Sequence, residues 1–496
     1  MSATAAPLET PGLSPVEVLR IWLKHLTSLY LPGLSLAFVL TGPHAWWVAI
    51  LFMLPLVYAH HVDCSARAER RQPSRDVPAW PFDALVYLLV AIQIAIVAGL
   101  VWMFAGSQGV FSADMVMTFL VVGGSSGFSI ITAHELIHRP RKLDQYLGRL
   151  LLSSVLYEHF YTEHLRGHHV RVGTSDDPAT ARFGERYESF FRRTVPAQLR
   201  SAWRLETRRL GDEDMSLFDR RQLGNRVVHG LVFEWGIAAT ILATLGVAAF
   251  IAFVAQAFMA VRLLEAVNYF EHWGLQRQGT RVAPVDSWDT HGWFTYYGLV
   301  GLSRHADHHA YPIRPYQKLR VWEEAPTLPF GYVGTVDQVL ADNAAFMQTA
   351  TEELGRRRLG PFRPEDGEPA EPLAPEQALA ALDDATRAED ARAATPLGPR
   401  VWIEKLGAIL NGTAGRIGAL AALLLITTIG VQAEGGAAEM AFGARLLLHG
   451  WIFASVAALI FVGHRLKLRT EHESLAWTAG MAVLALLGVT SGWIFG

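Results

Sequence analysis

Cysteine is almost absent from this 496-residue sequence, in which Cys64 is the single one. One cysteine excludes an internal disulfide, and it also excludes a four-cysteine zinc or iron–sulfur site within the chain. Charge is scarce as well, because Asp, Glu, Lys and Arg make up 18% of the residues, against about 25% in ordinary soluble proteins. The formal net charge of −3 says little about partners, and we expect no nucleic acid.

Long hydrophobic runs take the place of the missing charge, since 51% of the residues are hydrophobic. A membrane-spanning helix needs about 20 apolar residues, and nine windows approach or reach that length. They lie at 26–41, 44–62, 83–105, 113–133, 229–247, 248–266, 412–432, 442–463 and 475–495. The windows at 229–247 and 248–266 are short, so a partial hairpin is an alternative there. The start of the sequence has no basic region followed by an apolar one, so we expect no cleaved signal peptide.

Basic residues follow the second and fourth windows, whereas the 106–112 loop carries no charge. By the positive-inside rule, both basic loops are expected on the cytoplasmic side. The residues concerned are Arg67, Arg70, Arg71 and Arg75 after the second window, and Arg139, Arg141 and Lys142 after the fourth.

The sequence divides into three parts. In residues 1–360, two polar stretches at 134–228 and 267–360 are expected to form a cytoplasmic cap over six spans. Residues 361–400 are rich in Pro, Ala, Glu and Asp, which predicts a solvated linker with a short helix at 375–392. Residues 401–496 carry the last three spans, whose glycines permit close helix contact, so we expect a packing or oligomerisation role there.

Histidine is the most informative residue type. Of nineteen histidines, nine fall into four short motifs near the ends of predicted spans. They are His134 and His138 in HELIH, His164, His168 and His169 in HLRGHH, His272 in NYFEH, and His305, His308 and His309 in RHADHH. Nine neutral imidazoles exceed what one metal needs and suit two. Imidazole binds Fe, Zn, Cu and Ni alike, so the ligand type narrows the metal without fixing it.

Helical spacing predicts how these histidines pair. Residues four apart share a helix face, so His134 with His138, and His164 with His168, are expected to bind one metal each. His305 is expected to share a face with either His308 or His309. Neighbouring helical residues point about 100° apart, so each doubled histidine can serve two metals.

HELIH also satisfies the HExxH pattern of zinc proteases, in which the glutamate is the general base. A membrane zinc protease is therefore an alternative, but it leaves the other three motifs unexplained. Under the two-metal interpretation, Glu135 is a candidate to orient a ligand histidine. The same role is open to Glu163, Asp176, Asp177, Glu271 and Asp307, for each of which a surface carboxylate is an equal alternative.

These motifs, together with WRLE at 203–206 and APTLPFGY at 325–332, resemble the membrane-bound alkane hydroxylase (alkane 1-monooxygenase) family over roughly residues 20–335. The resemblance implies an all-α integral-membrane protein of the fatty-acid desaturase-like superfamily, with six transmembrane helices and a cytoplasmic di-iron centre. It implies that all nine histidines are iron ligands and catalytic residues. It also implies O₂-dependent hydroxylation of an alkane at its terminal methyl, electrons from rubredoxin and its reductase, and a bacterial inner-membrane location.

The sequence departs from the family pattern at two places near RHADHH. Ser303 stands where the family usually has glutamine, and Trp288-Asp289 stands for a tryptophan-asparagine pair. These departures leave open a desaturase, or a hydroxylase of another lipid-like or alkyl-aromatic substrate. A metal transporter is a further class, but it would place histidines along a pathway rather than at one membrane face.

Because Cys64 is alone, no rubredoxin is fused within this sequence, and electrons are expected from a separate protein. An arginine-rich stretch is a candidate to dock such an acidic carrier, and contact with anionic lipid is an equal alternative. It comprises Arg182, Arg186, Arg192, Arg193, Arg200, Arg204, Arg208 and Arg209.

Overall fold

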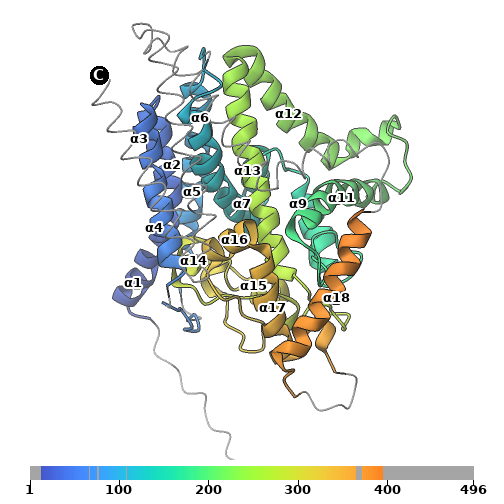
Figure 1. Ribbon diagram of the computed structural model, residues 1–496. Helices are drawn as coiled ribbons and strands as arrows, with labels where there is room; N and C mark the ends of the chain where they lie inside the picture. The colour runs from blue at the N-terminus through green and yellow to red at the C-terminus, as the bar shows by residue number, and fades with distance from the viewer. Residues whose placement is uncertain (1–12, 66, 75–76, 108, 365–370, 395–496) are drawn as a thin grey trace, which may run out of the picture. The chain divides into compact units, whose positions relative to one another are not determined.

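A computed structural model describes residues 13–65, 67–74, 77–107, 109–364 and 371–394, and the regular structure of this part is helical (Figure 1). Within these ranges the only strand-like pairings are two isolated β-bridges. The all-α fold expected from the sequence is confirmed. The three predicted spans at 412–432, 442–463 and 475–495, and most of the C-terminal part, lie outside the described residues.

Six helical stretches are long and apolar enough to cross a membrane, so the chain is a multi-pass membrane protein. They are α1 (Pro15–His25) with α2 (Tyr30–Thr41), α3 (Trp46–Leu51) with α4 (Met53–Asp63), α5 (Trp80–Met103), α6 (Ala113–Met117) with α7 (Gly123–Ile137), α12 (Arg226–Leu245) and α13 (Val247–His272). Helices α12 and α13 have 20 and 26 residues, so each is longer than its sequence window and reaches the length of a full crossing.

By their contacts, the described residues form two units. The larger holds residues 13–42, 52–107 and 117–394 and contains every histidine of the four motifs. The smaller holds residues 43–51 and 109–116, where the backbone N–H and ring Nδ1 of His44 each lie 2.8 Å from the carboxylate of Asp114. His44 therefore has a structural partner of its own.

Helices α7 and α13 pack closely because small residues face the neighbouring helix. A Cβ at Gly123 of α7 would lie 2.6 Å from the Cβ of Met259 on α13, so no larger residue fits there. A Cβ at Gly127 would likewise lie 3.2 Å from Leu263. This close approach keeps two spans together, each of which carries a motif histidine in its last turn.

Shorter helices between and after the spans carry the remaining motifs. They are α8 (Lys142–Ser153), α9 (Phe160–Glu163), α10 (His169–Arg171), α11 (Tyr187–Arg209), α14 (Trp293–Gly298), α15 (His305–Ala310), α16 (Tyr332–Ala341), α17 (Asn343–Arg357) and α18 (Pro375–Ala394).

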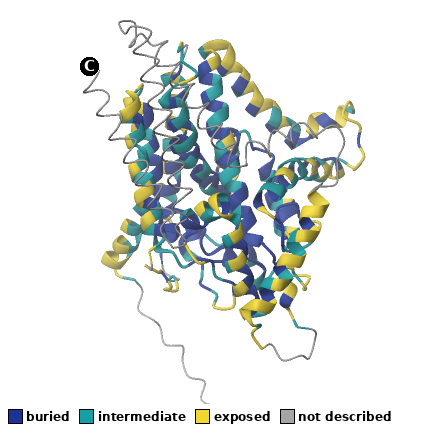
Figure 2. Ribbon diagram, in the orientation of Figure 1, coloured by how far each residue is buried: buried dark blue, intermediate teal, exposed yellow. Residues whose placement is uncertain are grey.

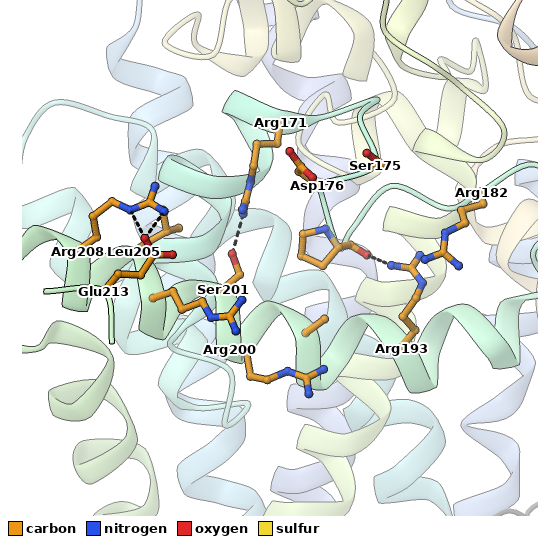
Figure 3. A pocket seen from close by; sticks show the side chains of 13 residues that line it. Arg171, Ser175, Asp176, Arg182, Arg193, Arg200, Ser201, Leu205, Arg208 and Glu213 are labelled. Atoms are coloured by element: carbon orange, nitrogen blue, oxygen red, sulfur yellow. Dashed lines mark hydrogen bonds and ion pairs between the residues drawn. The ribbon is translucent and has the colours of Figure 1, made fainter. Parts of the chain in front are cut away.

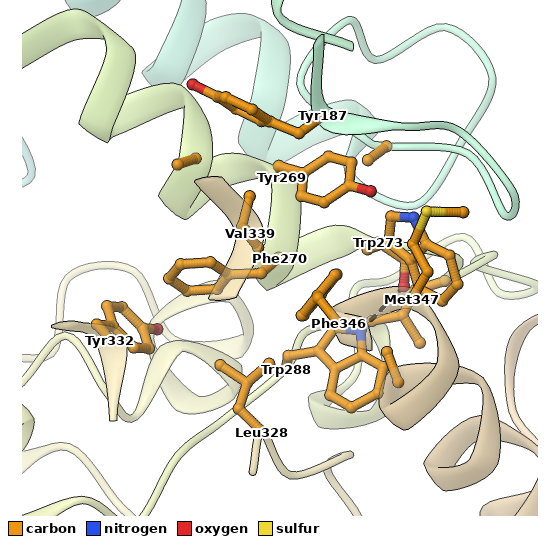
Figure 4. Close-up of a cluster of buried hydrophobic side chains, with 14 of the residues drawn as sticks. Tyr187, Tyr269, Phe270, Trp273, Trp288, Leu328, Tyr332, Val339, Phe346 and Met347 are labelled. Atoms are coloured by element: carbon orange, nitrogen blue, oxygen red, sulfur yellow. Dashed lines mark hydrogen bonds between the residues drawn. The ribbon is translucent and has the colours of Figure 1, made fainter. Parts of the chain in front are cut away.

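Large aromatic side chains anchor the end of α13 to the shorter helices that follow it (Figure 4). Trp273 and Trp288 are fully buried, and the Trp288 indole N–H donates to the backbone oxygen of Trp273 at 3.0 Å. Phe346 of α17 packs edge-on against Trp273 and at a tilt against Tyr269. Truncating such a buried aromatic typically costs about 3–5 kcal/mol. The cluster therefore gives His272, which precedes Trp273, a firm support.

Asp63, at the end of α4, ties the first spans to the cap. Its buried carboxylate accepts hydrogen bonds from the hydroxyl and backbone N–H of Thr295 at 2.6 and 3.1 Å. It also accepts from the N–H groups of Val333 and Gly334, at 2.8 and 3.2 Å, in the first turn of α16. A helix N-terminus favours a negative charge, so Asp63 stabilises α16 while fixing its position.

Helix α18 covers the segment for which the sequence predicted a short helix at 375–392. It is two residues longer, and it is packed rather than solvated, because Ala378 and Leu382 are buried on one face against α17. Its outer positions are exposed (Figure 2). Two of its carboxylates, Glu389 and Asp390, lie within ion-pair distance of Arg182 and Arg186.

Candidate metal centre

The nine motif histidines come together as two groups, each with its ring nitrogens within 4.8 Å of one another. One group has five members: His134, His138, His164, His169 and His308. The other has four: His168, His272, His305 and His309. Either group is large enough to hold a metal ion. Sequence reasoning therefore named every histidine of the two groups and no histidine outside them.

The helix α7 places its two histidines as the sequence predicted. His134 lies in the last α-helical turn and His138 is the C-terminal cap, so the two rings share a face with centroids 4.9 Å apart. Both belong to the five-histidine group.

The second motif departs from its predicted pairing. Residues His164–His168 form η3, a turn of π-helix, whose hydrogen bonds join residues five apart instead of four. His164 therefore shares a face with His169, and their Nε2 atoms lie 3.0 Å apart. His168 turns toward the four-histidine group. The prediction that His164 and His168 bind the same metal is wrong, because it assumed an α-helical turn.

The fourth motif, RHADHH, resolves the alternative that the sequence left open. On α15, His305 joins the same group as His309, four residues later, and their ring centroids lie 4.4 Å apart. His308 joins the five-histidine group. The doubled histidines 168–169 and 308–309 each serve both groups, as expected.

The chemistry of this donor set fits metal binding. Ring Nε2 atoms approach each other to 3.0–3.2 Å in both groups, and several buried ring nitrogens have no hydrogen-bond partner. Burial, then neighbouring histidines, holds the pKa of His138, His164 and His169 well below the usual value, and His305, His308 and His309 behave alike. Neutral imidazoles with converging lone pairs are the form that binds a metal.

Two of the six candidate carboxylates lie beside a ligand ring. The Asp177 Oδ2 atom is 2.9 Å from His168 Nδ1, and the Glu271 Oε1 atom is 3.2 Å from His305 Nδ1. Asp176 instead lines a surface groove. The remaining three bind elsewhere: Glu135 to Arg139, Glu163 to Arg171, and Asp307 to Arg314, Trp322 and the N–H of Arg320.

The zinc-protease interpretation finds no support in this geometry. Its general base would be Glu135, but Oε1 of that residue accepts from Nε and Nη2 of Arg139 at 3.1 and 3.0 Å. His134 and His138 also gather with three further histidines, whereas a mononuclear zinc site needs three ligands and a water.

The two departures from the family pattern are buried beside α15. Ser303 is fully buried, and Asp289 accepts from the N–H of Ala306 at 2.7 Å. Burial raises the pKa of Asp289 to about 8, so this carboxyl is largely protonated at neutral pH. A protonated carboxyl offers one donor and one acceptor, as the asparagine amide does. Asp289 therefore supports the histidine-bearing helix directly, which sequence reasoning did not anticipate.

Two positioning residues were missed from the sequence, although both lie in the quoted motifs. The guanidinium of Arg304 donates to the backbone oxygens of Leu319 and Arg71 at 2.6 and 2.8 Å, and it lies over the Tyr296 ring. The Tyr332 hydroxyl donates to Glu271 at 2.6 Å. The position of Arg304 directly before His305 was a signal that could have identified it. No comparable signal in the sequence points to Tyr332.

An arginine-lined groove of about 490 Å³ opens beside the loop after His169 (Figure 3). Arg171 and Asp176 line it from that loop, and α11 contributes Arg193, Arg200 and Arg204. Arg171 also donates to Glu163 and Ser201, each at 2.7 Å. Arg200 and Arg204 make no ion pair with any carboxylate in the described ranges. The groove is thus a positively charged surface one short loop away from two motif histidines.

Helices that cross a membrane and a buried nine-histidine centre able to hold two metal ions define a membrane metalloprotein. The profile of the fatty acid desaturase family matches residues 111–336. An alkane 1-monooxygenase 2 of Alcanivorax borkumensis is 32% identical over 311 residues, which cover 59% of this chain and 79% of the relative. The chain belongs to the alkane 1-monooxygenase family, and it is thereby a monooxygenase of the desaturase-like superfamily.

Other relatives extend this picture. The alkane 1-monooxygenase of Acinetobacter baylyi is 39% identical over 229 residues, covering 44% of this chain and 54%, about half, of the relative. The hydroxylase component of a Pseudomonas putida xylene/toluene monooxygenase is 23% identical over 202 residues, covering 40% of this chain and 54% of that protein.

Proposed function

We propose that this chain uses O₂ to hydroxylate the terminal methyl group of an alkane, giving the 1-alkanol, at two iron ions held by the nine histidines. One oxygen atom enters the alcohol and the other leaves as water, with two electrons and two protons supplied. The observation that carries the proposal is the pair of adjacent histidine groups, in a chain whose relatives are named alkane 1-monooxygenases.

Iron, when bound, would activate O₂, the oxidant that attacks the unactivated C–H bond. The residues of this chain hold the site in place and keep water out. All nine histidines are buried or nearly so, and the Trp273 and Trp288 rings close the region behind His272. Asp177 orients the His168 ring through Nδ1, which leaves Nε2 directed at the group. The nine imidazoles themselves add no negative charge.

Metal and product analysis tests this proposal. Purified protein should hold about two iron ions per chain. With medium- and long-chain alkanes, O₂ and reductant, it should release 1-alkanols. An alkene product would indicate a desaturase, and faster turnover of xylene or toluene would favour the alkyl-aromatic alternative suggested by the more distant relative. One zinc ion, with proteolysis abolished by Glu135→Gln, would replace the proposal with the protease interpretation.

Electrons, we propose, come from a separate rubredoxin, reduced by its reductase, that binds at the arginine-lined groove. Support comes from Arg200 and Arg204, which have no carboxylate partner among the described residues, and from the short segment between the groove and His169. Because rubredoxin would bind by charge attraction, Arg200→Glu with Arg204→Glu should raise the KM for rubredoxin at least several-fold. The same change should make that KM less dependent on salt concentration. The exposed Arg281→Glu is the matched control.

Turnover with a chemical reductant should be unchanged in the double variant, since its metal centre is intact. If KM for rubredoxin stays the same while binding to vesicles of anionic lipid falls, the groove serves the membrane surface instead.

For location, we propose the bacterial inner membrane with the metal centre on the cytoplasmic side. The basic loops after the second and fourth spans support this orientation. We also propose that residues 1–360 are the hydroxylase domain and that 401–496 form a separate transmembrane part. Protease protection in inside-out and right-side-out vesicles tests the orientation, because the exposed Arg141 and Lys142 should be cut only from the cytoplasmic side.

A further inference from the structure

The two histidine groups differ in their surroundings as well as in ligand number. Four contacts between a histidine ring and a carboxylate occur within the described ranges, at His44, His60, His168 and His305. Two of these rings belong to the four-histidine group, and none belongs to the five-histidine group. This difference between the two histidine groups rests on the carboxylates of Asp177 and Glu271.

Asp177 is a fixed acceptor with no cationic side chain beside it other than His168. Its Oδ2 atom also accepts from the Thr180 hydroxyl at 2.7 Å, and its Oδ1 atom accepts from the N–H of Ala179 at 3.2 Å. The side chain is fully buried. No arginine or lysine of the described ranges lies within 4 Å of it. Its negative charge is therefore directed at His168 and at whatever His168 binds.

Glu271 stands in a similar position at the other end of the same group. Oε1 of this residue lies 3.2 Å from His305 Nδ1, in contact but not aligned for a hydrogen bond, and it accepts from the Tyr332 hydroxyl at 2.6 Å. Tyr332 is held in turn, since its backbone N–H donates to the Thr295 hydroxyl at 2.7 Å. Thr295 is itself bound by Asp63. The position of Glu271 is thus set from outside the centre.

Carboxylates near the five-histidine group are each neutralised by an arginine. Glu135 follows His134 but binds Arg139, and Glu163 precedes His164 but binds Arg171. Asp307 precedes His308 and binds Arg314. None of the three lies within ion-pair distance of a ring in that group.

We propose that the two metals are electronically unequal, and that Asp177 and Glu271 are positioning residues that favour the higher oxidation state of the metal in the four-histidine group. This rests on the proposed function, which supplies the metals. A carboxylate hydrogen-bonded to a ligand imidazole, as Asp177 is to His168, raises the basicity of that ligand. Its charge also stabilises a nearby cation in a buried, low-dielectric setting. Both effects lower the reduction potential of the adjacent metal more than that of the five-histidine metal, which lies farther from Asp177.

Mössbauer spectra of protein loaded with ⁵⁷Fe test the inequality. The wild type should give two doublets of equal area, and redox titration should show two midpoint potentials. Asp177→Asn keeps an acceptor but removes the charge, so it should shift one doublet, raise one potential, and speed chelator extraction of one iron by about 10–100-fold. Tyr332→Phe, which leaves Glu271 without its main donor, should change the same doublet in a smaller degree.

Glu135→Gln is the matched control, because this carboxylate adjoins a five-group ligand but binds Arg139. It should leave both doublets and both potentials in place. The proposal is overturned if Asp177→Asn changes both doublets equally or neither, while iron stays near two per chain. If the purified wild-type chain binds no iron at all, the proposed function is wrong, and this inference is wrong with it.

Discussion

The motifs HELIH and HLRGHH carry the same ligand type, with His138 and His164 lying 26 residues apart in the chain, yet they distribute their histidines differently. His134 and His138 sit on an α-helical turn and serve one group, whereas η3 is π-helical and separates His164 from His168. Local backbone hydrogen bonding therefore decides which histidine group a ring joins. An ion pair bridges each segment, Glu135 with Arg139 and Glu163 with Arg171.

The largest effect is expected from removing the two neighbouring ligands of the second motif one at a time. His169→Ala should empty the five-histidine group, and His168→Ala should empty the four-histidine group. Each variant should retain about one iron and lose hydroxylation at least 100-fold, because even a partner of a ligand is typically worth about 10–100-fold. Mössbauer spectra should lose opposite doublets. Loss of the same doublet from both would contradict the division into groups. The exposed His61→Ala is the control.

A change of register tests the π-helical turn itself. Inserting an alanine after Gly167 puts His164 and His169 six residues apart, which fits neither helix type, so iron content should fall below about one per chain. Deleting the exposed Arg166 leaves them four apart, one α-helical turn, and should retain more iron than the insertion does. Equal iron loss in both variants would show that the spacing is not what pairs these two residues.

Helix α18 should stabilise the segment that follows HLRGHH more than it stabilises the segment around HELIH. A chain ending after residue 364 lacks Ala378 and Leu382 of the buried cluster, and it also lacks the ion-pair partners of Arg182 and Arg186. Thermal unfolding should then occur at a clearly lower temperature, since a single buried leucine is worth about 2–5 kcal/mol. A chain ending after residue 394 should keep its iron and its hydroxylation. Equal stability of the two truncated chains would contradict the packing role of α18.

The smallest effect is expected at Gly167, inside η3. A Cβ there would lie 2.5 Å from the Glu163 carboxylate oxygen, so Gly167→Ala should displace the ion pair with Arg171 at a cost of about 1–3 kcal/mol. Iron content should stay near two while the unfolding temperature drops. Gly124→Ala, in α7 with open space around its Cβ, is the matched control and should not lower stability, because alanine favours a helix more than glycine does.

Much of this molecule follows from the sequence alone. Hydropathy located six spans because a lipid-facing helix must be apolar along its whole length, and α5 shows this most clearly, with no charge beyond Asp83. The nine histidines were also identified from the sequence, since so many imidazoles in short motifs have few other uses. Both signals are local, and a local signal can be read without knowing what packs against it.

Only the tertiary structure decided how the ligands divide and which carboxylates act on them. His164 and His168 have the spacing of His134 and His138, but the π-helical turn depends on contacts around it, among them the Glu163–Arg171 ion pair. Glu135 directly follows His134, and Glu271 directly precedes His272. Yet Glu135 faces Arg139, whereas Glu271 faces His305. The direction of a buried polar side chain is set by partners from distant segments, such as Tyr332 for Glu271, and sequence spacing carries no record of those partners.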